Sequence, residues 1–209
     1  MFSDQLQPGV DHGGNSPYRG LIYRIFQPRR DSLQGVAIAV TSPNRGAGTS
    51  YVVQSLATEL GSYPGNRVLS VDLVTLASTL RSDLQIMELI TATENQSVCE
   101  IRRALSSVNG HEPANWWHAG LENRGHSIDR LRETFQYVIF DCPAVLESGE
   151  ALGIAPLVDG FLLVVEADRT TREDVAQAET QIESAGGRIY GSILNKLKPG
   201  ISDWVQRKG

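Results

Sequence analysis

Five short apolar runs, separated by segments with helical spacing, constrain the fold of this chain more than any other feature. The runs are Val36–Val40, Val68–Val71, Tyr137–Phe140, Phe161–Val165 and Ile189–Leu194. Their apolar residues are continuous rather than alternating, which is typical of strands buried on both faces. Because helical patterns lie between them, right-handed β–α–β crossovers are expected. The sequence therefore predicts an α/β fold with a doubly wound, mostly parallel sheet flanked by helices.

Four helices can be placed around this sheet. Tyr18–Gln27 has helical spacing and ends at a proline. Residues 52–60 carry one apolar stripe, with Gly61 as the expected C-cap. A capping-box signature predicts a helix that begins near Ser97 and runs through Leu105. A further helix is expected between Thr171 and Gly186.

Length and composition indicate a single globular domain. The 209 residues are 41% hydrophobic and 21% charged, which suits one α/β core. Residues 1–17 are polar and rich in Gly, Pro, Asp and Asn, so we expect a flexible tail followed by one domain over residues 18–209. Residues 106–127 carry scattered histidines and tryptophans without metal-ligand spacing, and we interpret them as packing and surface residues.

Charge, cysteines and hydropathy restrict the location and the partners. The formal net charge is −5, which gives no electrostatic case for nucleic-acid binding. The two cysteines, Cys99 and Cys142, have no paired spacing and fit a reducing compartment. No apolar run reaches the roughly 18 residues of a membrane span, and the start lacks signal-peptide features. We therefore expect a cytoplasmic protein that reaches a membrane only through a partner.

A glycine-containing loop, Thr41–Ser50, follows the first expected strand and leads into a helix. Glycines let backbone N–H groups turn around an anion, and the helix adds the positive end of its dipole. The candidate phosphate-binding residues are Arg45, Gly46, Ala47, Gly48, Thr49 and Ser50. The Ser50 hydroxyl stands where a Mg²⁺ ligand is needed, but Thr49 occupies the position of the lysine that bridges phosphates in such loops. All three lysines of the chain come later, beginning with Lys196.

Three polar residues lie at the ends of later strands. Asp72 and Asp141 are candidate catalytic residues, Asp141 also as a metal ligand, since ligands of parallel sheets bind beyond the carboxyl ends of the strands. Asn195, at the end of the last strand, is a candidate for reading a base edge with its amide. Each aspartate taken alone is equally consistent with a helix cap or a turn, and Asn195 alone with a turn.

These motifs together resemble the bacterial tyrosine kinases (BY-kinases) of capsule and exopolysaccharide synthesis, which belong with the ParA/MinD-type ATPases among the P-loop NTPases. The resemblance runs from about residue 16 to 196 and is weakest over 75–126. The matching segments are 18–27, 41–50, Arg67–Asp72, Tyr137–Pro143, Ala155–Gly160, Val164–Val165, Thr170–Asp174 and Gly191–Lys196. The resemblance implies ATP or ADP with Mg²⁺ as cofactors and, as a partner, either a membrane-anchored polysaccharide co-polymerase or an active kinase paralogue.

The chain departs from the family pattern at several functional positions. The Walker A lysine is Thr49, the second acid of the following motif is Val74, and a basic position after it is Leu76. In the first helix, which helps the family to form rings, Arg19 matches, but Ser16 and Ile22 replace a glutamate and an arginine. Members often carry a tyrosine-rich tail, whereas no tyrosine follows Tyr190 here.

Three hypotheses remain open from the sequence. The chain is a degenerate kinase-like protein that acts by binding, a working ATPase or tyrosine kinase that manages without the lysine, or a ParA/MinD-like positioning ATPase. The tail without tyrosine and the altered motif after Asp72 favour the first hypothesis, and the Thr41-Ser42-Pro43 approach to the loop argues against the third. The second hypothesis is kept by five retained residues, Gly46, Gly48, Ser50, Asp141 and Asn195. A charge from Arg45, on the same loop, is one possible substitute for the lysine, and homo-oligomers are possible.

Overall fold

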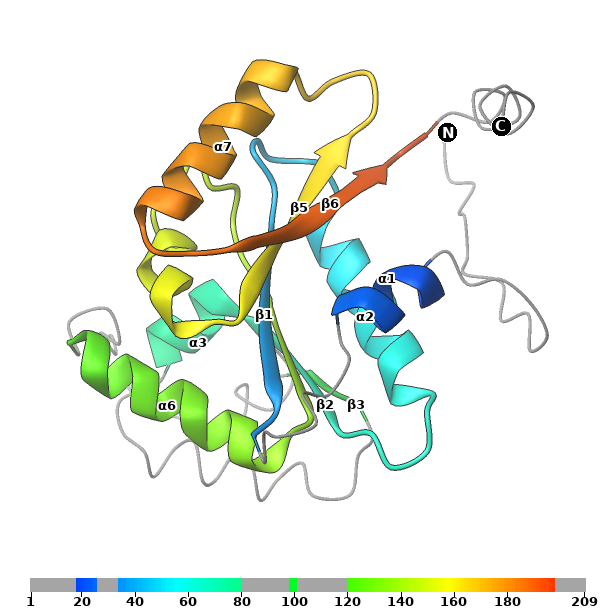
Figure 1. Ribbon diagram of the computed structural model, residues 1–209, viewed down its shortest axis with the longest axis vertical. Helices are drawn as coiled ribbons and strands as arrows, with labels where there is room; N and C mark the ends of the chain where they lie inside the picture. The colour runs from blue at the N-terminus through cyan, green and yellow to red at the C-terminus, as the bar shows by residue number, and fades with distance from the viewer. Residues whose placement is uncertain (1–17, 26–33, 80–97, 101–119, 198–209) are drawn as a thin grey trace.

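Six strands form one sheet in the part of the chain that the computed structural model describes, residues 18–25, 34–79, 98–100 and 120–197. The strands are β1 (Val36–Thr41), β2 (Val68–Asp72), β3 (Val98–Glu100), β4 (Tyr137–Asp141), β5 (Gly160–Glu166) and β6 (Ile189–Asn195). Their spatial order is β3-β2-β4-β1-β5-β6, and every neighbouring pair is parallel (Figure 1). The predicted α/β fold with a parallel sheet is confirmed.

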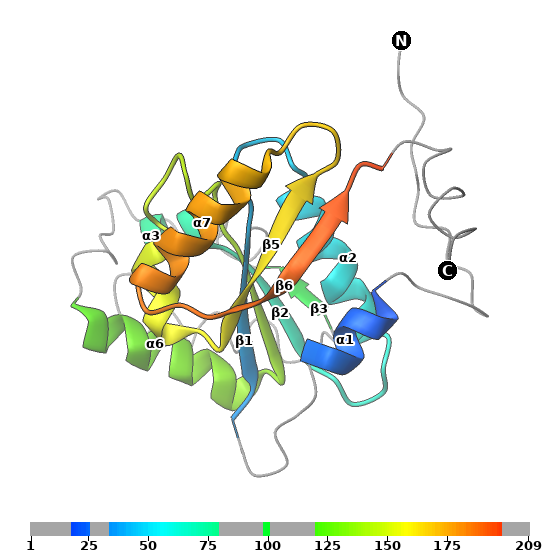
Figure 2. The ribbon, with the colours of Figure 1, turned by 45° about the horizontal axis from the view of Figure 1, so that its top comes forward.

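Helices cover both faces of the sheet (Figures 1 and 2). One face carries α1 (Arg19–Ile25) and α2 (Thr49–Gly61). The other carries α3 (Leu73–Thr79), α6 (Leu121–Thr134), the 3-10 helix η3 (Leu152–Leu157) and α7 (Arg172–Ser184).

The central strand β1 explains why the apolar runs are continuous. Ile38 and Val40 pack with α2, whereas Ala37 and Ala39 pack in the core of the opposite face. All four side chains are buried, so both faces of the strand require apolar residues.

Three of the four helices predicted from the sequence are present in the structure. The expected helix over 18–27 is observed as α1 within its described residues, and the apolar stripe over 52–60 is the buried face of α2. The last residue of α2 is Gly61, and its C-cap is Ser62 rather than the expected Gly61. At α7, Thr171 is the N-cap, and its side chain and that of Asp174 form the reciprocal bonds of a capping box. No helix among the described residues is long and apolar enough to cross a membrane.

The prediction of a helix from Ser97 through Leu105 is wrong where it can be tested. Val98–Glu100 is strand β3, which pairs in parallel with β2 at the edge of the sheet. The open edge of β2 offers backbone partners, and this pairing outweighs a local capping signature. The prediction also missed α3 and α6, and α6 begins inside the segment 106–127. The predicted tail over residues 1–17, and the part of 106–127 before residue 120, lie outside the described residues.

Candidate functional site

The loop between β1 and α2 has the backbone geometry of an anion-binding nest. Gly46 and Gly48 both have φ of 90°, a left-handed conformation that glycine adopts without steric cost. Gly48 is also the N-cap of α2 and provides no side-chain cap, so α2 presents backbone N–H groups at this end. Successive N–H groups and a helix N-terminus directed to one point favour an anion.

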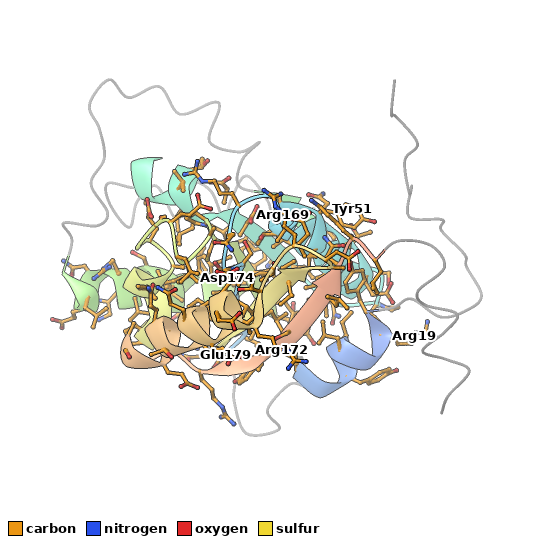
Figure 3. All side chains as sticks on the ribbon, turned by 90° about the horizontal axis from the view of Figure 1, so that it is seen from above. Arg19, Tyr51, Arg169, Arg172, Asp174 and Glu179 are labelled. Carbon is orange, nitrogen blue, oxygen red and sulfur yellow. The ribbon has the colours of Figure 1, made fainter. Side chains whose placement is uncertain are left out.

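A cavity of about 370 Å³ lies between this loop and the ends of β2 and β4. Its lining is Ser42, Arg45, Gly46, Gly48, Thr49, Ser50, Tyr51, Asp72, Val74, Asp141, Cys142, Pro143 and Ala144. Figure 3 looks down on this edge of the sheet, with Tyr51 and Arg169 labelled among the surrounding side chains. The structure thus brings most of the predicted site residues together, but it places Ala47 and Asn195 outside this lining.

The two candidate aspartates are neighbours because β2 and β4 are paired in register. Asp72 and Asp141 are Cα partners at the last step of the ladder, and both line the cavity. Asp72 also accepts a hydrogen bond from the backbone N–H of Thr75 at 2.7 Å, so it caps the start of α3. The alternative interpretation of Asp72 as a helix cap therefore holds beside its position at the cavity. Catalytic and metal-binding roles for the pair stay predictions.

Thr49 makes a neutral contact at the position of the expected lysine. Its hydroxyl donates to Oγ of Ser42 at 3.3 Å, and the Ser42 hydroxyl donates to the backbone oxygen of Asn44 at 2.9 Å. This chain of hydroxyl groups fixes the Thr49 side chain across the base of the loop. It contributes no positive charge to the cavity.

Arg45, the suggested substitute for the lysine, is already paired. Its Nε lies 2.8 Å from Oε2 of Glu147, and its backbone N–H donates to Oε1 of the same carboxylate at 2.7 Å. The Arg45 side chain is 78% exposed. Glu147 thus pairs with the guanidinium at the surface and also accepts a hydrogen bond from one of the loop's N–H groups.

The outer side of the loop is held by the end of β6. Nδ2 of Asn195 donates to the backbone oxygen of Ala47 at 2.8 Å, and Nζ of Lys196 donates to the backbone oxygen of Gly46. Nζ of Lys196 also lies 3.1 Å from Oε1 of Glu166. Asn195 therefore binds the loop's backbone in this structure, and its proposed reading of a base edge stays a prediction.

Sequence reasoning missed Lys196, Glu166, Arg169 and Glu147 as neighbours of the loop. All four lie more than 100 positions from the loop residue that they approach, so no local motif connects them. One feature of the sequence could have drawn attention to Lys196. Lys196 is the first lysine of the chain and directly follows Asn195 at a strand end.

The motif around Asp72 departs from the family pattern at Val74 and Leu76. The two departures have different consequences. Val74 is 51% exposed and lines the cavity, so the missing acid is lost from the site itself. Leu76 is 1% exposed and belongs to the core, where a basic side chain would have no water or partner.

Cys142 also lines the cavity. Burial, followed by the negative charge of Asp141, raises the pKa of its thiol well above the ordinary value. The thiol therefore stays protonated at neutral pH, and it does not have the character of a nucleophilic thiolate.

The donor set can be tested against Mg²⁺ and a nucleotide. No group of three or more His, Cys, Asp or Glu side chains that could hold a metal is found among the described residues. Magnesium in nucleotide sites, however, is usually held by one or two protein oxygens together with phosphates and waters. Ser50 and Asp141 are suitable oxygen donors at the cavity, and the loop suits a diphosphate. The residues do not fit a triphosphate equally well, because Thr49 is neutral and Arg45 is paired with Glu147, so neither supplies a cation for the third phosphate.

No protein-family model matches the chain. Curated relatives include the tyrosine-protein kinase CpsD of Streptococcus agalactiae, 29% identical over 180 residues that cover 80% of this chain and 78% of that protein. The succinoglycan biosynthesis transport protein ExoP of Rhizobium meliloti is 39% identical over 72 residues, which cover 33% of this chain but 9% of that protein.

Solved structures agree with the fold. The kinase domain of VpsO superposes with a TM-score of 0.60 at 20% identity, covering 87% of this chain and 93% of that one. The MinD cell division protein of Aquifex aeolicus gives a TM-score of 0.56 at 20% identity, covering 83% and 73%. At these identities the likeness concerns the fold.

Proposed function

Since the chain belongs to the bacterial tyrosine kinase (BY-kinase) family within the ParA/MinD-like P-loop proteins, we propose that it is a degenerate member that acts by binding. Its role is regulatory or scaffolding, in exopolysaccharide or capsule biosynthesis and export. Turnover of ATP is weak or absent, which makes the protein a pseudokinase.

The observation that carries this proposal is the absence of an available cation inside the loop. Thr49 offers a hydroxyl that is engaged with Ser42, and the charge of Arg45 is compensated by Glu147. One donor aimed at developing charge in a transition state contributes about 10²–10³ in rate. A loop without that donor is expected to lose turnover far more than it loses affinity.

The retained parts of the site support weak nucleotide binding. Gly46 and Gly48 keep the nest conformation, and Ser50 and Asp141 supply oxygen donors for Mg²⁺. These groups suit a diphosphate, whereas a γ-phosphate adds negative charge beside Asp72 and Asp141. We therefore expect ADP to bind at least as well as ATP.

The partner is proposed to be a membrane-anchored polysaccharide co-polymerase or an active kinase paralogue. The relatives named above support this, since one is a tyrosine-protein kinase and another a succinoglycan biosynthesis transport protein. Such a partner would recruit a cytoplasmic chain to the inner face of the membrane. The structure is also compatible with a homo-oligomer formed through α1. Arg19, which matches the family's ring-forming helix, is exposed, but Ile22, which replaces a family arginine, is buried against α2.

The second candidate is an active ATPase or tyrosine kinase of the same family. It is favoured by one observation, the register that places Asp72 beside Asp141 at the cavity. A ParA/MinD-like positioning ATPase is the third, and the likeness to MinD supports only its fold.

Calorimetric titration with ATP and with ADP, each with Mg²⁺, separates these candidates. The expected result is weak binding at most, with no preference for ATP, and no phosphate release above that of an Asp141→Asn control. Micromolar or tighter ATP binding that is preferred over ADP would favour the active enzyme. Adenosine serves as the ligand control, because it lacks the phosphates that the loop would hold.

A further inference from the structure

Two successive carbonyl groups of the loop are bound by two successive residues at the end of β6. The backbone oxygen of Gly46 accepts from Nζ of Lys196, and that of Ala47 accepts from Nδ2 of Asn195. A loop that turns its N–H groups toward an anion must turn carbonyl groups away from it, and those carbonyls need partners of their own. Here the partners come from a strand about 150 positions later in the chain.

We infer that Lys196 is a positioning residue for the phosphate loop: with Asn195 it clamps the outward carbonyls, and it supplies positive charge to a loop that has no lysine of its own. The inference deepens the proposed function, because it rests on the loop retaining a phosphate. Lys196 acts through the loop rather than as a member of the cavity lining.

Lys196 belongs to a group of three charged side chains beside the loop. Glu166, whose side chain is 14% exposed, contacts Nζ of Lys196 at 3.1 Å and Nη1 of Arg169 at 3.4 Å. Two cations share one carboxylate, so these three groups sum to +1. Arg169 also lies against the loop, since a Cβ added at Gly46 would lie 3.3 Å from its Nη1. The charge that the family places inside the loop is thus partly replaced from outside.

The backbone at the end of β6 is shaped for this contact. Asn195 is the Cα partner of Glu166 in the β5–β6 ladder, and its carbonyl accepts from the N–H of Ala167 at 2.9 Å. The next residue, Lys196, has φ of 59°, a left-handed conformation that is uncommon for a residue other than glycine. A Cβ at Gly48 would clash with Nδ2 of Asn195, so the loop and the clamp fit only without that atom. A surface ion pair formed by chance would require neither the left-handed backbone at Lys196 nor the absence of a Cβ at Gly48.

The experiment compares Lys196→Met, Lys196→Gln and a matched control, Arg188→Gln. Arg188 precedes the opposite end of β6, where its guanidinium stacks 5.4 Å from the centre of the Tyr190 ring. Calorimetry with pyrophosphate and Mg²⁺ is expected to show a loss of affinity of about tenfold in Lys196→Met, the effect of one charge-assisted bond. Lys196→Gln should lose less because its amide can still donate, and Arg188→Gln should bind as the wild type does. An equal loss in Arg188→Gln would overturn the inference, since it would reduce the effect to net charge.

A second arm needs no ligand. Amide hydrogen exchange by NMR should become faster in Lys196→Met at Arg45 and Val52, whose N–H groups are bonded at the loop, but not at Phe135, which is bonded to Leu131 on α6. Unchanged exchange at Arg45 and Val52 would overturn the clamp. If the wild type binds no pyrophosphate, the nucleotide part of the proposed function fails, and the exchange result alone decides the positioning role.

Discussion

Thr49 is the residue whose replacement tests the site most directly. Thr49→Lys places a cation at the base of the loop, in a cavity that already contains the carboxylates of Asp72 and Asp141. ATP binding should strengthen by about 1.5–3 kcal/mol, the contribution of a hydrogen bond to a charged group. Hydrolysis should rise only slightly, because Val74 still lacks the carboxylate expected there. Calorimetry and phosphate release measure the two effects.

Thr58→Lys is the matched control for this substitution. It makes the same chemical change on the exposed face of α2, where the Thr58 hydroxyl only bonds the backbone oxygen of Gln54. It should leave ATP affinity unchanged. If Thr49→Lys folds but binds ATP no better than Thr58→Lys, the loop is not a phosphate cradle, and the domain is better regarded as an interaction module without a nucleotide.

Residues of the site differ in how far the sequence could reveal them. Gly46, Gly48 and Thr49 belong to one short motif, so their proximity follows from the chain itself. Asp72 and Asp141 could be placed together because the carboxyl ends of parallel strands meet at one edge. The pairing of Arg45 with Glu147, and of Lys196 with Gly46, depends on loop conformations that no spacing rule encodes.

At the scale of elements, a helix or strand could be predicted when its own sequence carried a clear pattern of sufficient length. The five apolar runs identified five strands, and the segment between Thr171 and Gly186 was recognised as the helix that is observed as α7. Strand β3 has three residues, and its existence depends on pairing with β2 rather than on its own pattern. Helix α6 is polar over most of its length, and only Ser127, Ile128 and Leu131 are buried, so its apolar stripe is too sparse to stand out.

The capping box of α7 gives a prediction at this scale. Thr171→Ala removes the hydroxyl that accepts from the N–H of Asp174 at 3.1 Å. The free energy of unfolding should fall by about 1 kcal/mol, the usual cost of losing an N-cap side chain. Urea unfolding measures it, with Thr180→Ala as the control, since Thr180 lies on the same helix and bonds only the backbone oxygen of Ala176. An equal loss in both variants would contradict a specific capping role.

The same cap should respond to pH. The pKa of Asp174 is lowered from 3.8, first because its carboxylate accepts from the backbone N–H of Thr171. A group with a depressed pKa in the folded state adds stability above its unfolded pKa and loses it as the pH falls through the folded value. The urea midpoints of the wild type and Asp174→Ala should therefore differ most at neutral pH and converge in acid. A constant difference down to acid pH would mean that the charge of Asp174 does not contribute.

At the scale of the whole molecule, the sheet order concentrates function at one edge. The strands β2, β4, β1, β5 and β6 are consecutive in the sheet, and their carboxyl ends deliver Asp72, Asp141, the loop, Glu166 and Asn195. The fold therefore gathers the candidate site residues at one edge of the sheet while individual side chains change. This explains how a chain can keep the architecture of a kinase family with altered chemistry, and why the fold alone cannot decide activity.

The last prediction concerns the phosphorylation state of the purified chain. After incubation with ATP and Mg²⁺, mass spectrometry should find no phosphotyrosine, because the loop has no available cation to hold a γ-phosphate for transfer. The described tyrosines differ in how far they could accept a phosphate. Tyr137 is buried in β4, whereas Tyr23 on α1 is 58% exposed and Tyr51 beside the cavity is 47% exposed. Robust modification of Tyr18 or Tyr23 would contradict the pseudokinase proposal, provided that it disappears in Asp141→Asn. Phosphotyrosine that persists in Asp141→Asn would come from another kinase, because that variant lacks the carboxylate on which the chain's own transfer would depend.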